Sequence, residues 1–282
     1  MDTLSRSWDL LGQSFAVLKS DKELMWLPVL SAMFCLAATA IILGIGLIVV
    51  MPPGPFPHDA AQQKLLGKAM APFIFLFYFV IYSLGIYFNV ALVSIASNRL
   101  VGGHATLNDG LQTAWKRKWS ILQWALLAAT VGMLLQTLER CLSVLGRVLT
   151  RITGFVWVLA SFFVVPLLAA EDMGPLEALY KSQQIFRRTW GEEVAGGFSF
   201  GLIFLLLTLP GLLLPVMGAR LGQTEMLAGA GVMVIYWLLL GVANSAAQGI
   251  FVAALYRYAT KQEVSAGYDL DDLSGAWQPK VR

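Results

Sequence analysis

Residues 106–136 constrain the fold more than any other stretch, because a half-polar segment passes directly into a long uncharged one. The first half, TLNDGLQTAWKRKW, ends in a basic cluster formed by Lys116, Arg117 and Lys118. The second half, SILQWALLAATVGMLLQ, carries no charged side chain. Basic residues collect at the cytoplasmic ends of membrane-spanning helices. The junction therefore predicts a transmembrane helix whose basic end lies in the cytoplasm.

The composition excludes a water-facing globular surface. Only 13% of the 282 residues are charged and 57% are hydrophobic, whereas soluble domains carry about 25% charged residues. The basic residues stand in short clusters between apolar stretches, which indicates topology signals and lipid contacts rather than a nucleic-acid surface. Cys35 and Cys141 form no CxxC motif, so we expect no zinc or redox site.

The hydropathy pattern predicts six transmembrane helices, at residues 24–51, 71–97, 121–138, 154–170, 194–218 and 226–258. The first is longer than the apolar part of a signal peptide, and no small-residue cleavage site follows it. We expect a loop over 52–70, with Pro72 in the first turn of the second helix. Pro210 and Pro215 should kink or fray the outer end of the fifth.

Three amphipathic helices precede the first, third and fifth spans, at residues 4–18, 107–118 and 176–188. We expect the tryptophans in or just after these helices to lie in the membrane interface, and these are Trp8, Trp115, Trp119 and Trp190. For the first helix, packing against the membrane bundle is an equally weighted alternative. Residues 139–153 are also amphipathic, and the pattern leaves open whether they lie in the interface or inside the membrane.

The distribution of basic residues predicts the topology. If every span crosses, 14 Lys and Arg residues fall on the side of the termini and six on the other. The positive-inside rule then places both termini in the cytoplasm. The expected fold is an all-α polytopic membrane protein with three parallel repeats of interfacial helix plus hairpin. We expect one membrane domain over 1–259 and a polar, partly disordered tail over 260–282.

No catalytic group is evident. No carboxylate lies at mid-depth in a predicted span, and no phosphate-binding loop or metalloprotease motif occurs. His58 and His104 lie in predicted loops, where solvated side chains are the simplest interpretation. The sequence therefore predicts no enzyme, no cofactor and no metal site.

Polar and small residues within the spans are candidates for a path or for helix packing. These are Asn89, Asn244, Gln248, Gly241, Ser245 and Gly249. The polar side chains could line a water path, but hydrogen bonding between helices is the simpler alternative. The last three form consecutive small-xxx-small steps that would allow another helix to approach closely.

Arg140, Arg147 and Arg151 are spaced so that one continuous helix would place them near one face. We favour contact with lipid phosphates at the outer interface. A solvated face is a second interpretation, and an anion-selective mouth in an oligomer is a third.

Several motifs resemble a bacterial family of integral membrane proteins that is known only as a domain of unknown function. The motifs are Ser7-Trp8 with Ser14 and Leu18, DKELMWLP at 21–28, FNVAL at 88–92, Trp157 with FFVVP at 162–166, GPLEAL at 174–179 with Ser182, and TWGE at 189–192. The rhythm of helix and hairpin is also similar to the membrane domain attached to some glycerophosphodiester phosphodiesterases. The resemblance implies location in a bacterial inner membrane and supplies no activity.

Two functional hypotheses follow. The first is a non-enzymatic scaffold or bundle that interacts with lipid or a partner protein. The second is an oligomeric channel or passive permease, with anion selectivity as one form. Membrane lipids are the expected partners, a homo-oligomer remains open, and no nucleic-acid partner is expected.

Overall fold

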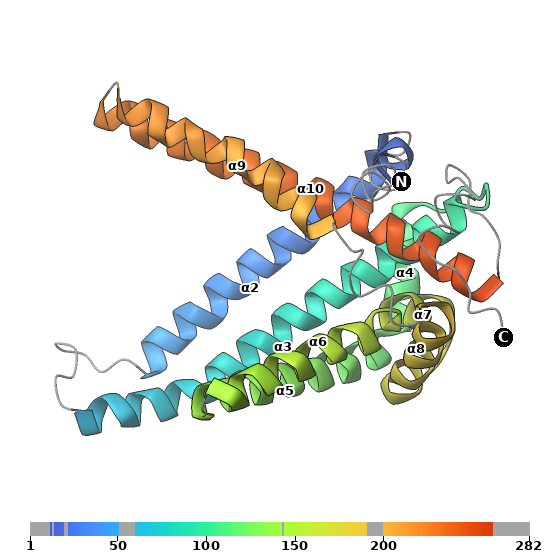
Figure 1. The fold of residues 1–282 in the computed structure, drawn as a ribbon, viewed down its shortest axis with the longest axis horizontal. Helices are drawn as coiled ribbons and strands as arrows, with labels where there is room; N and C mark the ends of the chain where they lie inside the picture. The colour runs from blue at the N-terminus through green and yellow to red at the C-terminus, as the bar shows by residue number, and fades with distance from the viewer. Residues whose placement is uncertain are drawn as a thin grey trace. The chain divides into compact units, whose positions relative to one another are not determined.

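The computed structural model describes Gly12 and residues 14–19, 22–50, 60–142, 144–190, 200–220 and 222–261. Every regular element among these residues is a helix (Figure 1). The elements are η1 (Lys22–Met25), α2 (Trp26–Val50), α3 (Ala60–Arg99), α4 (Leu107–Lys116), α5 (Lys118–Cys141), α6 (Val144–Ser161), α7 (Val164–Ala170), α8 (Pro175–Trp190), α9 (Phe200–Ala219) and α10 (Gln223–Lys261).

Five stretches of helix are long and apolar enough to cross a membrane: Glu23–Ile48, Gly67–Arg99, Lys118–Cys141, Gly146–Ala170 and Gln223–Thr260. A sixth, Phe204–Ala219, is apolar but shorter. Large apolar side chains are exposed along these helices; Leu36, Ile48 and Leu239 are each more than 60% exposed. Such surfaces are stable in lipid and not in water, so the chain crosses the membrane several times.

The second predicted span differs from α3 at its start. Residues 60–70, expected in a loop, are helical, and Pro72 lies inside the helix rather than in its first turn. The sequence AAQQKLLGKAM explains the difference, because most of its residues favour helix although the segment is too polar for hydrocarbon. Hydropathy marks the depth of the membrane and not the end of the helix. His58 and the rest of 51–59 lie outside the described residues.

Contacts group the chain into two units. The first consists of Met1–Val29, Leu92–Gly110 and Gln184–Arg282, and the second of Leu30–Ala91 and Leu111–Gln183. The single domain over 1–259 stays a prediction, as does the disordered tail, since residues 262–282 lie outside the described part of the chain.

In the first unit, α9 and α10 lie side by side as a hairpin (Figure 1). The hydroxyl of Tyr236 donates to the carbonyl of Leu207 at 2.6 Å, and the indole N–H of Trp237 donates to the carbonyl of Thr208 at 3.2 Å. Both carbonyls lie in the turn before Pro210. The helix continues through Pro210 and Pro215 to Ala219, so the expected fraying does not occur.

The amino-terminal segment packs on the same unit. The ring of Phe15 stacks on that of Phe204, with centroids 6.2 Å apart. Ser14 and Leu18 are buried. These contacts support the alternative in which the first amphipathic segment packs against the bundle. Trp8 lies outside the described residues.

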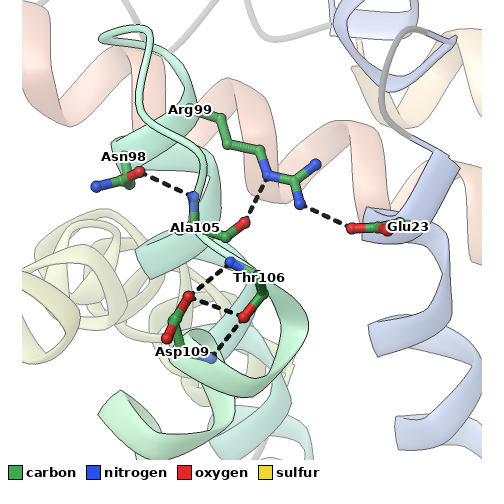
Figure 2. A network of polar contacts seen from close by, with 6 residues as sticks. All are labelled: Glu23, Asn98, Arg99, Ala105, Thr106 and Asp109. Carbon is green, nitrogen blue, oxygen red and sulfur yellow. Dashed lines mark hydrogen bonds and ion pairs between the residues drawn. The ribbon is translucent and has the colours of Figure 1, made fainter.

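A polar network fixes the connection between α3 and α4 (Figure 2). The Arg99 side chain donates from Nε to the Ala105 carbonyl at 2.8 Å and from Nη2 to a Glu23 carboxylate oxygen at 2.9 Å. Asn98 accepts from the backbone N–H of Ala105 at 3.1 Å. Gly102 has a φ of 79°, a conformation that favours glycine. The network ties the α3–α4 turn to the start of the first span.

A reciprocal cap begins α4 (Figure 2). The backbone N–H and the hydroxyl of Thr106 both donate to one Asp109 oxygen at 2.8 Å, and the N–H of Asp109 points back to the Thr106 hydroxyl oxygen at 3.4 Å. This is the capping-box arrangement with aspartate at the third position. The hydrogen bonds from the Thr106 backbone and hydroxyl lower the pKa of Asp109.

In the second unit, α5 and α6 form a second hairpin, and the return path breaks at Phe162 and Phe163 before α7. A side chain of α8 occupies the break. The hydroxyl of Ser182 donates to the carbonyl of Ala160 at 2.7 Å and accepts from the N–H of Phe163 at 3.0 Å. Ser182 and Phe163 are fully buried. The resemblance motif FFVVP and the Ser182 that accompanies GPLEAL therefore meet at one structural joint.

Candidate functional site

The corner between α4 and α5 presents a cation between two aromatic rings. Arg117 leaves the helical conformation between Lys116 and Lys118, so the chain turns there. The Lys118 ammonium lies 4.3 Å from the centre of the Trp115 ring and 5.9 Å from that of Trp119. Trp115 is 61% and Trp119 68% exposed. We call these three residues the Trp–Lys–Trp corner.

An ion pair holds this corner in place. The Arg117 guanidinium binds the carboxylate of Asp172, which lies in the link between α7 and α8. The Arg117 side chain is only 20% exposed, whereas that of Asp172 is 87% exposed. Next to this pair, the Lys181 ammonium lies 2.5 Å from a Glu171 oxygen. Arg117 is therefore held by its ion pair with Asp172, while Lys118 is half-buried beside the two exposed indole rings.

A second pair of tryptophans lies deeper in the same unit. The rings of Trp124 and Trp157 stack with centroids 5.6 Å apart and an angle of 16° between their planes. Trp124 is 5% exposed, unlike the tryptophans at the corner. Burial assigns Trp124 to the core of the hairpin, and the half-buried Trp157 packs on it by stacking. The exposed pair at the corner remains available to the surroundings.

The spacing of charges sets the hairpin's membrane register. No charged residue occurs in α5 between Lys118 and Glu139, a rise of about 30 Å. The return from Arg151 to Glu171 is uncharged over a similar length. The hydrocarbon core of a bilayer is about 30 Å thick. The Trp–Lys–Trp corner and Glu171 therefore lie at the depth of one boundary of the hydrocarbon core. Glu139 and Arg151 lie at the depth of the opposite boundary.

The three arginines near the hairpin tip do not share one helical face. Arg140 lies at the end of α5, while Arg147 and Arg151 lie one turn apart on α6. The prediction of one continuous face was wrong because α5 ends at Cys141 and a separate helix, α6, begins at Val144. All three are exposed, and the Arg151 Nε donates to a Glu139 oxygen at 2.9 Å. Residues 139–153 form the tip and the adjoining helix ends.

The candidate path residues are only partly brought together. The amide of Gln248 donates to that of Asn244 at 2.9 Å within α10. Asn89 and Gln248 are exposed, and they belong to different units. The structure thus provides a local hydrogen bond between two of these polar residues.

The small-xxx-small steps of Gly241, Ser245 and Gly249 bring another helix close at the Gly249 end. A Cβ on Gly249 would lie 2.9 Å from Leu92 Cγ and closer still to its Cδ2, so α3 approaches α10 there. Gly241 has nothing within 4 Å of that position, and Ser245 is half-buried. The α9–α10 hairpin instead achieves close contact at Gly211, where a Cβ would lie 2.7 Å from the indole nitrogen of Trp237. The glycines in α9 and α10, two helices that follow closely in the chain, are the sequence feature from which this contact could have been predicted.

Two further predictions concern groups outside the Trp–Lys–Trp corner. Trp190 ends α8, and its side chain lies outside the described part of the structure, so its interfacial role stays a prediction. Among the described residues, no three His, Cys, Asp or Glu side chains are placed to hold a metal ion.

A chain with five apolar helices of membrane-spanning length and charged groups at the hairpin boundaries is a multi-pass membrane protein. Residues 69–266 match the Family of unknown function (DUF6159), and the chain belongs to this family. The expected resemblance to a domain of unknown function is thus confirmed, and the matched region excludes the motifs before residue 69. No curated protein and no solved structure is significantly similar to the chain.

Proposed function

We propose that the protein is a non-enzymatic bundle of a bacterial inner membrane that binds anionic lipid headgroups on the cytoplasmic side. The observation that carries the proposal is the Trp–Lys–Trp corner at the end of an uncharged helix. In this proposal α9 completes a sixth crossing and both termini are cytoplasmic. The helices preceding the odd spans then lie on the cytoplasmic side of three parallel repeats.

The chemistry of the corner suits a headgroup. Indole rings prefer the boundary between hydrocarbon and water, because one edge is apolar and the N–H is polar. Lys118 over these rings holds a positive charge at the same depth, where anionic lipids attract each cation by about 1 kcal/mol. The ion pair of Arg117 with Asp172 limits motion of the corner, which reduces the entropy lost on binding.

The distribution of charge supports the cytoplasmic assignment. The corner lies in the link that holds Arg99 and the three consecutive basic residues, one of the most basic segments of the chain. Anionic lipids of the cytoplasmic leaflet attract such segments. A reporter fused after Arg282 should be cytoplasmic, and a periplasmic reporter would contradict the proposed topology.

Lipid retention in purified protein tests the headgroup site. We expect Lys118→Gln to weaken binding of phosphatidylglycerol about fivefold, the equivalent of 1 kcal/mol, as measured by native mass spectrometry across a lipid titration. Lys116→Gln is the matched control, because it removes the same charge from a neighbouring residue with no ring contact among those described. Equal affinity in wild type and Lys118→Gln would refute the role of the corner.

The second candidate is an oligomeric channel or passive permease. The exposed amides of Asn89 and Gln248 on apolar helices favour it, because a polar side chain in lipid gains from a partner or from water. Such a path would form between copies of the chain, with the arginines as an anion-selective mouth. Planar-bilayer recordings of folded protein should then show conductance. Silence across voltages and salts would remove this candidate.

A further inference from the structure

We infer that Arg147 and Arg151 form a second site, which binds a phosphate group at the membrane boundary opposite the Trp–Lys–Trp corner. The inference rests on the membrane register of the proposed function and extends it to the other leaflet. It is carried by the geometry of the α5–α6 tip, where a carboxylate holds one of two adjacent arginines in place.

The turn is tight enough to bring the two helix ends together. Leu142 is extended, with its N–H bonded to the carbonyl of Leu138 at 3.0 Å. A Cβ on Gly146 would lie 2.5 Å from the Cβ of Leu142, so only glycine fits at this position without rearrangement. Glu139 on α5 thereby reaches Arg151 on α6.

The Glu139 bond leaves the arginine able to bind an oxyanion. It uses Nε, one of five guanidinium N–H donors, and the side chain of Arg151 is still 75% exposed. Arg147 lies one helical turn before Arg151, about 6 Å away along the same face, and is also exposed. Two forked donors at this spacing match the terminal oxygens of a phosphate group.

The two boundaries of the hairpin differ in how they can be anchored. Residues 139–153 contain no tryptophan, tyrosine or phenylalanine, whereas the opposite boundary has Trp115 and Trp119. An aromatic belt therefore cannot hold the tip at headgroup depth. Arginine–phosphate contacts supply the alternative, and the depth of Arg151 places it level with the headgroups. The phosphate comes either from a phospholipid or from the free anion.

The first test isolates the tip from the corner by using the Lys118→Gln protein. In this background we expect Arg147→Gln to weaken phosphatidylglycerol binding about tenfold, measured by native mass spectrometry in detergent. The matched control is Arg220→Gln, which removes an exposed arginine from the α9–α10 turn, also on the predicted outer side. Equal losses for both variants would show diffuse attraction and overturn the site. Every protein in this test carries Lys118→Gln, so a negative result excludes the tip site without testing the corner. A negative result for Lys118→Gln alone likewise excludes the corner without testing the tip.

A second variant distinguishes binding by positioned arginines from diffuse attraction to a positively charged tip. Glu139→Gln removes a negative charge, so diffuse attraction predicts tighter binding of phosphatidylglycerol. If Glu139 positions Arg151, the same variant should bind several-fold more weakly although its net charge has risen. Tighter binding would overturn the inference. Unchanged thermal unfolding in each variant shows that the fold is intact.

The source of the phosphate is resolved by competition. Displacement of phosphatidylglycerol by inorganic phosphate, and not by equal chloride, assigns the site to the free anion. Binding of phosphatidylglycerol that millimolar inorganic phosphate does not displace assigns it to the lipid. Equal retention of diacylglycerol, which has no phosphate, would overturn phosphate recognition in either form.

Discussion

Replacing Ser182 by alanine should destabilise the second unit by about 3 kcal/mol. One hydroxyl serves both sides of the break between α6 and α7, donating to the carbonyl of Ala160 and accepting from the N–H of Phe163. Alanine removes both bonds and leaves the volume nearly unchanged. The expected loss therefore measures the two hydrogen bonds rather than a cavity.

The magnitude follows from burial. A buried backbone group left without a partner costs roughly 1–3 kcal/mol. Phe163 is fully buried, which places its N–H toward the upper part of that range, while Ala160 is half-buried and belongs toward the lower part. The sum is about 3 kcal/mol, a large share of a typical domain stability of roughly 5–15 kcal/mol.

Unfolding by a denaturing detergent, followed by circular dichroism, would give the difference in free energy. Hydrogen exchange should show faster exchange of the Phe163 amide and its neighbours in Ser182→Ala. Ser161→Ala is the control, because its hydroxyl bonds to the carbonyl of Val158 within its own helix at 3.2 Å. The control should change stability by less than about 0.5 kcal/mol. A loss for Ser182→Ala no larger than the control's would refute the reasoning.

Two further predictions concern the first unit. Gly249→Ala should destabilise the protein by about 1–3 kcal/mol in the same unfolding assay, because Leu92 is buried and cannot yield, while Gly241→Ala has open space and should be neutral or stabilising. Hydrogen bonds from Thr106 lower the pKa of Asp109, so its contribution to α4 is present above the unfolded value and is lost as pH falls through the folded one. Thermal unfolding of wild type and Asp109→Asn should therefore converge in acid, and a gap independent of pH would contradict the cap.

Hydropathy located the membrane helices, because hydrocarbon imposes the same requirement on every segment of a chain. The span predicted at 121–138 lies inside α5, and that at 226–258 lies inside α10. The ends of these helices were harder to predict from hydropathy, because helix propensity and capping extend a helix into polar sequence. The start of α3 at Ala60 is the clearest case.

The tip between α5 and α6 and the break between α6 and α7 could not be predicted, because they depend on contacts that no local sequence pattern encodes. Periodicity placed Arg140 with Arg147 and Arg151 because it assumed one continuous helix, whereas α5 ends at Cys141 and α6 begins at Val144. The break at Phe163 depends on Ser182, which lies far along the chain on another helix. The resemblance pointed to both segments without showing that they meet.

Burial is concentrated toward one end of several helices. The buried residues of α5 all lie in its first half, at Ile121, Trp124, Ala125, Ala128 and Ala129. On the return path the buried residues, apart from Thr150, gather near the end, in Phe163 and α7. The last thirds of α3 and α10 are likewise the most buried parts of those helices.

Within the α5–α7 hairpin, the first half of α5 and the end of the return path match the same membrane boundary, so the dense packing of this hairpin lies at that boundary. The Trp–Lys–Trp corner then belongs to the densely packed end, where Arg117 fixes its geometry. The Arg147–Arg151 site belongs to the sparsely packed end, so its lipid contact can add stability that the protein core does not supply there. Phosphatidylglycerol should consequently raise the unfolding temperature more through the tip than through the corner, and a larger loss of that stabilisation in Lys118→Gln than in Arg147→Gln would contradict this assignment.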